Sequence, residues 1–276
     1  MSSVSDTLAQ GTALLRECSE APRADAMLLL ERALGRSRSW IVAYGETELA
    51  LPDAQTYDRL CERRRTGVPA AYILGSAGFY GNEFLVNESV LVPRPETEHL
   101  VDEAREFVGD RALAVLDVGT GSGAIACSIA RATPAVVDAT DLSAAALVVA
   151  GENAARLGVA DRCRFHLGDL VEPVAGRRFD VVVANLPYVP RADVPKAPHP
   201  VAFEPRVAVD GGADGLCLYR RLLKALPALH PSLVLLEAAP PTIEELAALV
   251  RAAFPTSAIE IREDYAGLAR YLKVAC

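Results

Sequence analysis

Two spacings of apolar residues divide the chain into a helical part and a mixed part. The helical spacing, with apolar residues three and four positions apart, occurs in SDTLAQGTALLRECSE (5–20), RADAMLLLERALG (23–35) and PDAQTYDRLCERRRTG (52–67). This spacing places the apolar side chains on one face of a helix. Gly35 is expected to end the second helix, and Pro52 and Gly67 to begin and end the third. We therefore predict a helical bundle domain over residues 1–75.

The pattern changes in GFYGNEFLVNESVLV (78–92), where aromatic and β-branched residues alternate around the turn-forming letters GN and NES. Alternation of this kind, interrupted by turn formers, is typical of a β-hairpin. We interpret residues 76–92 as a hairpin that links two domains.

From residue 112 onward, short apolar runs alternate with helical stretches. The runs are ALAVLDV (112–118), AVVDATD (135–141), CRFHLGD (163–169), DVVVANLP (180–187) and SLVLLEA (232–238). Strands rich in Val and Leu that alternate with helices predict a parallel sheet covered on both faces. The last two runs, 258–264 and 270–276, are too close for a helical crossover and predict an antiparallel hairpin at the sheet edge. Residues 93–276 are thus expected to form an α/β domain with a seven-stranded, Rossmann-like sheet.

The composition is that of an ordinary folded soluble protein, with 51% hydrophobic and 23% charged residues among 276. The net charge of -8 disfavours non-specific attraction to nucleic acid. Residues 1–88 hold nine Arg against twelve Asp and Glu, so they are not a basic arm. We interpret the run Arg63–Arg65 as a solvated helix end, which the helix dipole favours, rather than as a nucleic-acid contact.

Cysteines and histidines give no sign of a metal site. The six cysteines form no C-x-x-C pair and stand in apolar surroundings, which is typical of cytosolic thiols. The four histidines are isolated, and neither an H-E-x-x-H nor a Gly-x-Ser-x-Gly motif occurs. The N-terminus lacks the pattern of a signal peptide, and the apolar runs are too short to cross a bilayer. We expect a cytoplasmic, monomeric protein without a metal.

The segment VLDVGTGSGAIA (115–126) carries a glycine-rich loop between a predicted strand and a predicted helix. The loop consists of Gly119, Thr120, Gly121, Ser122 and Gly123. Glycines there allow a sharp turn and a close approach of backbone N–H groups to a ligand. Asp141 ends the second strand, 22 residues after the first glycine, where a carboxylate can accept both ribose hydroxyls of a nucleoside. The alternative is a tight turn in which this aspartate caps the next helix.

The loop also satisfies the loose dinucleotide pattern G-x-G-x-x-G/A, so a dehydrogenase is a rival hypothesis. Asp117 argues against it, because a carboxylate before the glycines is expected where a pyrophosphate would lie. The antiparallel last strand also argues against it. A cationic nucleoside such as S-adenosylmethionine would tolerate the carboxylate. Asp169, at the end of the third strand, could then approach the adenine amino group, with Leu170 against the ring; a turn aspartate is an equally good interpretation.

The stretch Asn185, Leu186, Pro187 and Tyr188 follows the fourth strand, and ligands of such sheets gather at this edge. A planar amide or aromatic amine is a poor nucleophile because its nitrogen lone pair is delocalised. The side-chain oxygen of Asn185 and the backbone carbonyl of Leu186 can each accept one N–H of such a group, which favours positive charge on the nitrogen. Pro187 fixes the backbone, and Tyr188 offers a face for stacking. A Pro-terminated strand with a surface Tyr is the competing interpretation.

These features together resemble a known family. The tetrapeptide and the glycine loop are similar to those of S-adenosylmethionine-dependent methyltransferases that act on planar nitrogen. Within that class, FLVNESVLVPRPETEHLVDEA (84–104), FEPRVAVDGGADGLCLYRRLL (203–223) and DYAGLARYLKV (264–274) resemble the release factor glutamine methyltransferases (PrmC/HemK) along almost the whole chain. The resemblance implies methylation of the glutamine of the GGQ loop of peptide chain release factors, with S-adenosylmethionine as methyl donor. It also implies a helical domain that recognises the substrate.

The resemblance further implies roles for individual residues. Asn185–Tyr188 would contact the substrate, while Gly119–Gly123, Asp141, Asp169, Leu170 and Asn185 would contact the cofactor. Phe79 and the segment Pro93–Glu98 would lie near the cofactor or shape a cleft. A structural ion pair of Arg94 and Glu98 between the hairpin and the sheet domain is an equally good interpretation of that segment.

Two departures from the family pattern keep other functions open. Leu186 stands where the family usually has a first Pro, and Asn-Leu-Pro-Tyr is the form found in rRNA adenine dimethylases. An adenine-N6 methyltransferase acting on rRNA or DNA is therefore an alternative. LLEAAPP (235–241) replaces the expected Leu-Glu-Ile-Gly and Gln. A non-catalytic, cofactor-binding partner of a translation factor is a third hypothesis.

Overall fold

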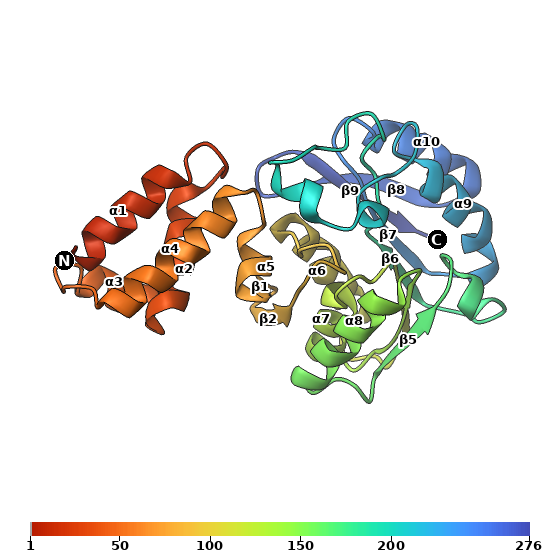
Figure 1. Cartoon of the computed structure of the whole chain (residues 1–276). Coiled ribbons are helices and arrows are strands. Elements are labelled where there is room, and N and C mark those ends of the chain that lie inside the picture. Colours follow the sequence, from red (N-terminus) through yellow and green to blue (C-terminus); the bar gives the residue numbers. More distant parts are fainter. Residues whose placement is uncertain (1) are drawn as a thin grey trace. The chain divides into compact units, whose positions relative to one another are not determined.

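A computed structural model describes residues 2–276 (Figure 1). The chain forms two compact units. A helical unit comprises the chain up to Ser76 together with Pro195–Phe203, and a sheet unit comprises Ala77–Val194 and Glu204–Cys276. Each is described separately below.

The helical unit is built from short helices around a small apolar core. Its helices are α1 (Val4–Leu14), α2 (Pro22–Leu34), α3 (Arg38–Ala43), α4 (Leu51–Arg65) and α5 (Ala70–Leu74). The three predicted helices are confirmed as α1, α2 and α4, although α1 ends at Leu14, well before the end of the predicted stretch 5–20. Gly35 ends α2 in the left-handed conformation at φ +59°, as predicted. The short helices α3 and α5 offer too few turns for a periodic apolar pattern, and the sequence did not predict them.

Close packing in this unit depends on one glycine. Gly11 of α1 lies against the buried ring of Tyr57 of α4, and a Cβ at residue 11 would come within 1.9 Å of the Tyr57 hydroxyl. Any larger residue would push the two helices apart. The unit's core includes Leu15, Leu29 and Leu30, each fully buried.

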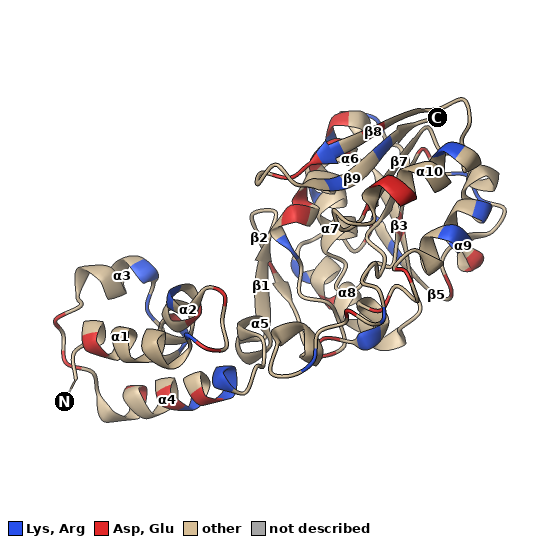
Figure 2. Ribbon diagram, turned by 90° about the horizontal axis from the view of Figure 1, so that it is seen from above, with Lys and Arg blue, Asp and Glu red and all other residues tan. Residues whose placement is uncertain are grey.

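The arginine run at the end of α4 is only partly a solvated helix end. Arg63 and Arg65 are exposed, but Arg64 is 3% exposed and its Nε lies 2.7 Å from the Asp25 carboxylate of α2. Buried charges need such partners, since removing one leaves the other uncompensated. Our interpretation of the run was therefore wrong for Arg64, because the side chain bridges two helices. Figure 2 shows acidic and basic positions interspersed along α4.

Residues 195–203 leave the sheet unit and contact the helical unit instead. A Cβ on Gly67, which has φ +100°, would fall 2.2 Å from the Pro198 carbonyl and 2.7 Å from the Phe203 ring. The loop thus lies directly on the end of α4. This proline-rich segment therefore has a packed position.

The sheet unit begins with the predicted hairpin and continues as alternating strands and helices. Its strands are β1 (Ser76–Phe79), β2 (Asn82–Leu85), β3 (Ala114–Val118), β4 (Val136–Asp141), β5 (Cys163–Leu167), β6 (Val181–Ala184), β7 (Leu233–Glu237), β8 (Ala258–Glu263) and β9 (Ala269–Ala275). Its α-helices are α6 (Glu98–Val108), α7 (Ala124–Ala132), α8 (Ala144–Arg156), α9 (Cys217–Ala225) and α10 (Ile243–Ala253), and its short 3₁₀ turns include η1 (Pro95–Thr97).

Seven strands form one mixed sheet in the order β5-β4-β3-β6-β7-β9-β8. The strands β3 to β7 pair in parallel, while β9 pairs antiparallel with both β7 and β8. The predicted seven-stranded α/β fold and its closing antiparallel hairpin are confirmed, with β8 at the edge. Side chains of α6, α7 and α8 join the apolar core on one face of the sheet, and those of α9 and α10 join the core on the other.

The strand order reverses direction at β3, which lies between β4 and β6. In an open parallel sheet, such a reversal leaves a crevice at the carboxyl ends of the strands, where ligands bind. The helices of residues 2–276 include none that is long and apolar enough to cross a bilayer.

Candidate active site

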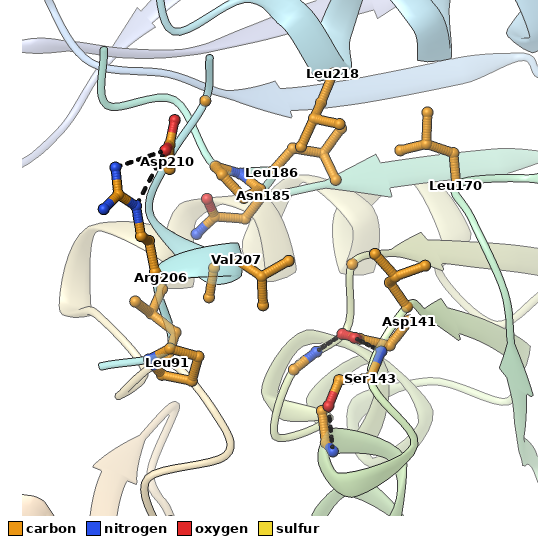
Figure 3. Close-up of a pocket in the computed structure, with 18 of the residues that line it drawn as sticks. Leu91, Asp141, Ser143, Leu170, Asn185, Leu186, Arg206, Val207, Asp210 and Leu218 are labelled. Atoms are coloured by element: carbon orange, nitrogen blue, oxygen red, sulfur yellow. Dashed lines mark hydrogen bonds and ion pairs between the residues drawn. The ribbon is translucent and has the colours of Figure 1, made fainter. Parts of the chain in front are cut away.

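A cavity of about 510 Å³ lies at this crevice, within the sheet unit (Figure 3). Loops at the ends of β3, β4, β5 and β6 line it, together with the segment Pro205–Gly212. Its volume is in the range of small-molecule sites. Both polar and apolar side chains face it, so one ligand can make both kinds of contact.

The glycine loop forms one wall of the cavity through its backbone. Gly119 and Gly121 line the cavity, with φ values of +77° and +54° that favour glycine. Thr120 and Ser122 are 7% and 3% exposed, and neither lines the cavity. Gly123 opens α7 and packs against α8, where a Cβ would lie 3.1 Å from that of Ala150. Thr120, Ser122 and Gly123 therefore support the cavity wall without lining the cavity.

Asp141 joins the glycine loop to the end of β4. Its carboxylate accepts hydrogen bonds from the backbone N–H of Gly121 and of Ser143, both at 2.8 Å, and it lines the cavity. The N-cap of α8 is Ser143, whose hydroxyl accepts from Ala146 N at 3.2 Å. The alternative interpretation of Asp141 as the helix cap is therefore wrong. Each carboxylate oxygen retains a lone pair for a ligand.

Asp117 lies under the glycine loop rather than in the cavity. It is fully buried and accepts hydrogen bonds from the Thr120 hydroxyl at 2.6 Å and from Ala126 N at 3.2 Å. Burial raises the pKa of this carboxyl to about 7. Our argument that Asp117 would repel a pyrophosphate was wrong, because its carboxylate points toward α7. The antiparallel last strand is confirmed.

The loop after β5 supplies a charged and an apolar lining residue. The Asp169 carboxylate pairs with Arg221 of α9 at 2.5 Å, and both residues line the cavity. Leu170 lines it as well, in a left-handed conformation at φ +48° that is uncommon outside glycine. The backbone thus turns this leucine toward the cavity, as Figure 3 shows.

The tetrapeptide Asn185–Tyr188, which follows β6, forms another part of the cavity wall. Asn185, Leu186 and Pro187 line the cavity. The Asn185 amide nitrogen donates to the Thr97 hydroxyl at 3.1 Å, so Oδ1 is the side-chain atom free to act as acceptor elsewhere. The Leu186 side chain is 3% exposed because it packs on Gly119, where a Cβ would lie 2.9 Å from Leu186 Cδ2.

Tyr188 takes a different direction from the three residues before it. It is absent from the cavity lining, and its hydroxyl donates to Glu237 Oε1 at 3.2 Å. Burial raises the pKa of this phenol well above its ordinary value. Its predicted role as a stacking face for the substrate stays a prediction.

A buried tyrosine that the sequence did not single out fixes the ends of β6 and β7. Leu186 N donates to the Tyr219 hydroxyl at 3.2 Å, and that hydroxyl donates to the Glu237 carbonyl. Tyr219 is fully buried and lies on α9. The sequence carried one signal for this role: Tyr219 occupies an apolar position of an amphipathic helix. A tyrosine there is expected to be buried, and its hydroxyl then needs hydrogen-bond partners.

The segment Pro205–Gly212 is another part of the site that pattern analysis missed. The Asp210 carboxylate accepts from Arg191 at 3.1 Å and from Arg206 at 3.3 Å. The backbone of Asp210 forms an isolated parallel β-bridge with that of Val189. A backbone hydrogen bond from Gly212 and these two arginines hold the pKa of Asp210 below its usual value. Val207, 55% exposed, presents an apolar side chain at the cavity.

The segment Pro93–Glu98 supports the site through Thr97, whose hydroxyl accepts a hydrogen bond from the Asn185 amide. Arg94 pairs with Glu204 at 2.7 Å, whereas Glu98 accepts from Tyr80 N at 2.7 Å. The Arg94–Glu98 ion pair that we considered is therefore wrong, since each charge has another partner. Phe79 is 2% exposed and packs on Phe84 in the sheet unit's core.

The cavity suits a nucleoside that bears an amino acid. Backbone N–H groups and the Asp141 carboxylate can serve hydroxyl groups, while Leu142, Leu170 and Val207 offer apolar surface to a purine ring. Leu142, which is 60% exposed, leaves its side chain open to a ligand in the cavity. Residues 2–276 contain no cluster of His, Cys, Asp or Glu able to hold a metal ion.

Comparisons with known proteins agree with this geometry. Residues 6–75 match the family model of the PrmC N-terminal domain, and residues 115–202 match that of a methyltransferase domain. The chain is 44% identical to the release factor glutamine methyltransferase of Bordetella pertussis over 75% of this chain and 77% of the relative. It is 41% identical to that of Moorella thermoacetica over 90% and 89% of the two chains.

A solved structure shows the same fold. The S-adenosylmethionine-dependent methyltransferase of Agrobacterium tumefaciens aligns with a TM-score of 0.51 and 16% identity, covering 72% of this chain and 69% of that one. At this identity the likeness shows the fold alone. The two curated relatives carry the assignment further, and by their identity and coverage the chain belongs to the release factor glutamine methyltransferase family.

Proposed function

We propose that this protein transfers the methyl group of S-adenosylmethionine to the side-chain amide nitrogen of the glutamine in the GGQ motif of a peptide chain release factor. One observation carries the proposal. The Asn185 amide nitrogen is bonded to Thr97, which leaves Oδ1 at the cavity as an acceptor for a substrate N–H. The family relatives are named for the same reaction.

Asn185, Leu186 and Pro187 form one end of the cavity, which we call the acceptor end. This end can hold a primary amide by two hydrogen bonds. Asn185 Oδ1 accepts one N–H, and the backbone carbonyl of Leu186 accepts the other. Both acceptors carry partial negative charge, so they stabilise the positive charge that develops on the substrate nitrogen. Holding the amide in line for attack supplies much of the acceleration, and orientation effects can be worth about 7–11 kcal/mol.

The exchange of Pro for Leu at residue 186 leaves this arrangement intact. The acceptor at that position is a backbone carbonyl, which leucine retains. The side chain is buried against the glycine loop, and Tyr219 holds the backbone N–H at 3.2 Å. A first Pro would have no N–H for that hydrogen bond. The tyrosine thus provides part of the rigidity that a proline ring would give.

When bound, S-adenosylmethionine supplies a methyl group on a positively charged sulfur, which keeps the S–C electron pair and becomes a neutral thioether. Gly119, Gly121 and Asp141 would hold its amino-acid and ribose parts, while Leu170 would lie against the adenine. The substrate nitrogen forms the new N–C bond with its lone pair and then loses a proton to solvent. The chain needs no general base before the displacement.

We further propose that the helical unit recognises the release factor, as an N-terminal domain distinct from residues 93–276. Its match to the PrmC N-terminal domain supports this assignment. A protein substrate also agrees with the net charge of -8, which disfavours nucleic acid. Because the proposed substrate takes part in translation, we propose that the enzyme acts in the cytoplasm, and that it acts as a monomer.

The test is transfer of label from methyl-tritiated S-adenosylmethionine to the organism's own release factor. A release factor with Gln→Ala in its GGQ motif and total rRNA serve as the two controls. We expect label on the wild-type factor alone. Label on rRNA would replace the proposal with adenine methylation. Cofactor binding without any label would favour the non-catalytic partner.

A further inference from the structure

Two arginines share one carboxylate at the cavity, and we call them the arginine pair. Arg191 Nε donates to Asp210 Oδ2 at 3.1 Å, and Arg206 donates to the same oxygen from Nε and Nη2, both at 3.3 Å. All three residues line the cavity, and the two arginine side chains are 65% and 69% exposed. In Figure 3, Asn185 lies between the Arg206–Asp210 contact and Asp141.

The arginine pair has donors that the described residues do not use. A guanidinium carries five N–H groups in a rigid planar fork and can only donate. Arg191 donates to Asp210 through Nε alone and Arg206 through Nε and Nη2, and neither side chain has another hydrogen-bond partner in residues 2–276. The pair also carries two positive charges against one negative charge. It therefore presents oriented donors to an oxygen acceptor of a ligand.

Backbone contacts fix the arginine pair to the acceptor end. Arg191 N donates to the Gly212 carbonyl at 2.7 Å, and Gly211 N donates to the Val189 carbonyl at 2.9 Å. A Cβ on Gly211 would lie 2.6 Å from the carbonyl oxygen of Pro187, so the two segments are closely packed. The unused donors therefore have a defined position relative to the group that we propose to bind the substrate amide.

We propose that Arg191 and Arg206 bind backbone carbonyl oxygens of the substrate loop that carries the glutamine. They would thus be specificity-determining residues that select a glutamine next to glycines. This inference deepens the proposed function and rests on it, because the proposed substrate is the GGQ loop of a release factor. The two arginines take no part in the methyl transfer itself.

Glycines beside the substrate glutamine suit this kind of recognition. A glycine has no Cβ, so a guanidinium can approach its carbonyl group closely. A carbonyl oxygen that loses water on entering a cavity needs a new donor, and a charged donor forms a stronger hydrogen bond than a neutral one. Val207 follows Arg206 in the chain and is 55% exposed at the cavity. Its side chain offers apolar surface to the methylene groups of the glutamine.

Two other ligands carry oxygen acceptors that the arginine pair would suit less well. A nucleic-acid phosphate needs positive charge, but Asp210 neutralises one of the two guanidiniums, and the net charge of -8 disfavours nucleic acid as a whole. The carboxylate of S-adenosylmethionine is the other rival. The position of Arg206 beyond Asn185, as seen from Asp141 in Figure 3, favours the substrate over the cofactor.

The first experiment measures binding of the release factor to the enzyme loaded with S-adenosylhomocysteine, by isothermal titration. Arg191→Met, Arg206→Met and the double variant remove the donors and keep an apolar stem. We expect Kd to rise about 10-fold in each single variant, as loss of a hydrogen bond to a charged group does, and further in the double variant. Arg220→Met is the matched control, because Arg220 also pairs with an aspartate, Asp214, but does not line the cavity.

The second experiment distinguishes the substrate from the two rival ligands. The affinity for S-adenosylmethionine should be unchanged in all of these variants. If the double variant lost affinity for the cofactor but not for the release factor, the arginine pair would bind the cofactor's carboxylate and the inference would be wrong. Loss of rRNA binding alone would overturn it as well, in favour of a phosphate.

The third experiment tests the contact with the substrate loop directly. A release factor with Gly→Ala at the position before the glutamine adds a Cβ where the guanidinium should approach. We expect this change to weaken binding to the wild type more than binding to the double variant. Interacting groups give such non-additive effects, whereas independent ones do not. Equal weakening in both proteins would show that the arginine pair does not contact this part of the loop.

These binding measurements separate the inference from the proposed function, because they need no turnover. If the wild type binds the release factor but transfers no methyl group, the proposed function fails while the role of the arginine pair is still tested. If the wild type methylates the release factor and the double variant binds it as tightly as Arg220→Met does, the inference is wrong and the proposed function stands. A wild type that binds no release factor would also overturn the inference.

Discussion

Asp117 and Glu237 are both fully buried at the carboxyl ends of parallel strands, and burial raises the pKa of each to about 7. Their partners differ. Asp117 accepts from Thr120 and from the backbone of α7, so it holds the glycine loop to its own helix. Glu237 accepts a hydrogen bond from the hydroxyl of Tyr188, the last residue of the tetrapeptide that follows β6.

The comparison extends to the two ends of the cavity. The end that we propose for the cofactor is shaped by glycine backbone, and the Asp141 carboxylate there stabilises a turn. The acceptor end is shaped by side chains that come from three separate parts of the chain. Equal burial and equal pKa therefore do not imply equal roles, and the partners of each carboxylate decide what it does. Four predictions test this difference.

The largest effect is expected at the acceptor end. Asn185→Ala removes the proposed acceptor for the substrate N–H, and loss of one such group costs about 10²–10³-fold in kcat. Cofactor affinity should change little, which isothermal titration with S-adenosylmethionine can check. Asn82→Ala, the same change in the hairpin turn, is the matched control. Parallel loss of turnover and cofactor affinity would contradict the role that we assign to Asn185.

At the cofactor end, Gly119→Ala should weaken S-adenosylmethionine binding. The new Cβ would lie 2.9 Å from Leu186 Cδ2, at a residue with φ +77°. Strain of this kind costs about 1–3 kcal/mol, equivalent to roughly 10- to 100-fold in affinity if the loop moves. Gly176→Ala is the control, since Gly176 has φ +79° and a Cβ there meets open space. Equal effects of the two changes on cofactor affinity would show that the Leu186 contact is irrelevant.

The two carboxylates should affect stability in the same direction. Each has a folded-state pKa above its unfolded value, so the folded protein holds an extra proton between the two values and stability falls as pH rises. For Glu237 the interval runs from 4.5 to about 7, worth about 3 kcal/mol. Denaturant unfolding at pH 5 and pH 8 should therefore show a smaller loss of stability in Glu237→Gln and in Asp117→Asn.

This pair of variants also sharpens the comparison. Glu237→Gln should leave cofactor affinity unchanged, whereas Asp117→Asn should disturb the glycine loop and thus cofactor binding. If Asp117→Asn lowered kcat alone, the division between the two ends of the cavity would be wrong. If neither variant altered the pH dependence of unfolding, both carboxyls would titrate normally in the folded protein.

The smallest effect is expected at Tyr219. Tyr219→Phe removes the hydroxyl between Leu186 N and the Glu237 carbonyl, leaving two buried groups without this partner. The expected loss of unfolding free energy is about 1–3 kcal/mol. The rate should fall only a few-fold, because the acceptor carbonyl remains. An unchanged stability would mean that water satisfies both groups.

The local pattern of the sequence was sufficient to predict the strands. It was also sufficient to predict the two loops that line the cavity, the glycine loop and the tetrapeptide. Val- and Leu-rich runs specify buried parallel strands, and glycines with an acidic residue 22 positions later specify the cofactor wall. The contact from Asn185 to Thr97 spans 88 positions, and neither residue carries a signal for the other. The Asp210 cluster likewise depends on a loop path that no periodicity encodes.

Side-chain direction was also beyond the sequence. Asp117 and Asp141 are both acidic residues at strand ends, yet only Asp141 lines the cavity. The partners differ: the Asp117 carboxylate accepts from Thr120 and Ala126 N, whereas that of Asp141 accepts from Gly121 N and Ser143 N. The direction of the Tyr188 side chain was likewise not predictable from the sequence, and its hydroxyl bonds to Glu237.

The path of residues 195–203 has a consequence for dissecting the protein. The chain crosses between the two units after Ser76, after Val194 and after Phe203, so the helical unit is discontinuous in sequence. A nick after Ser76 cuts the first of these three crossings, but Pro198 and Phe203 still cover Gly67. The fragments on either side of such a nick are therefore expected to behave as a split protein and to copurify, because residues 195–203 of the larger fragment complete the helical unit.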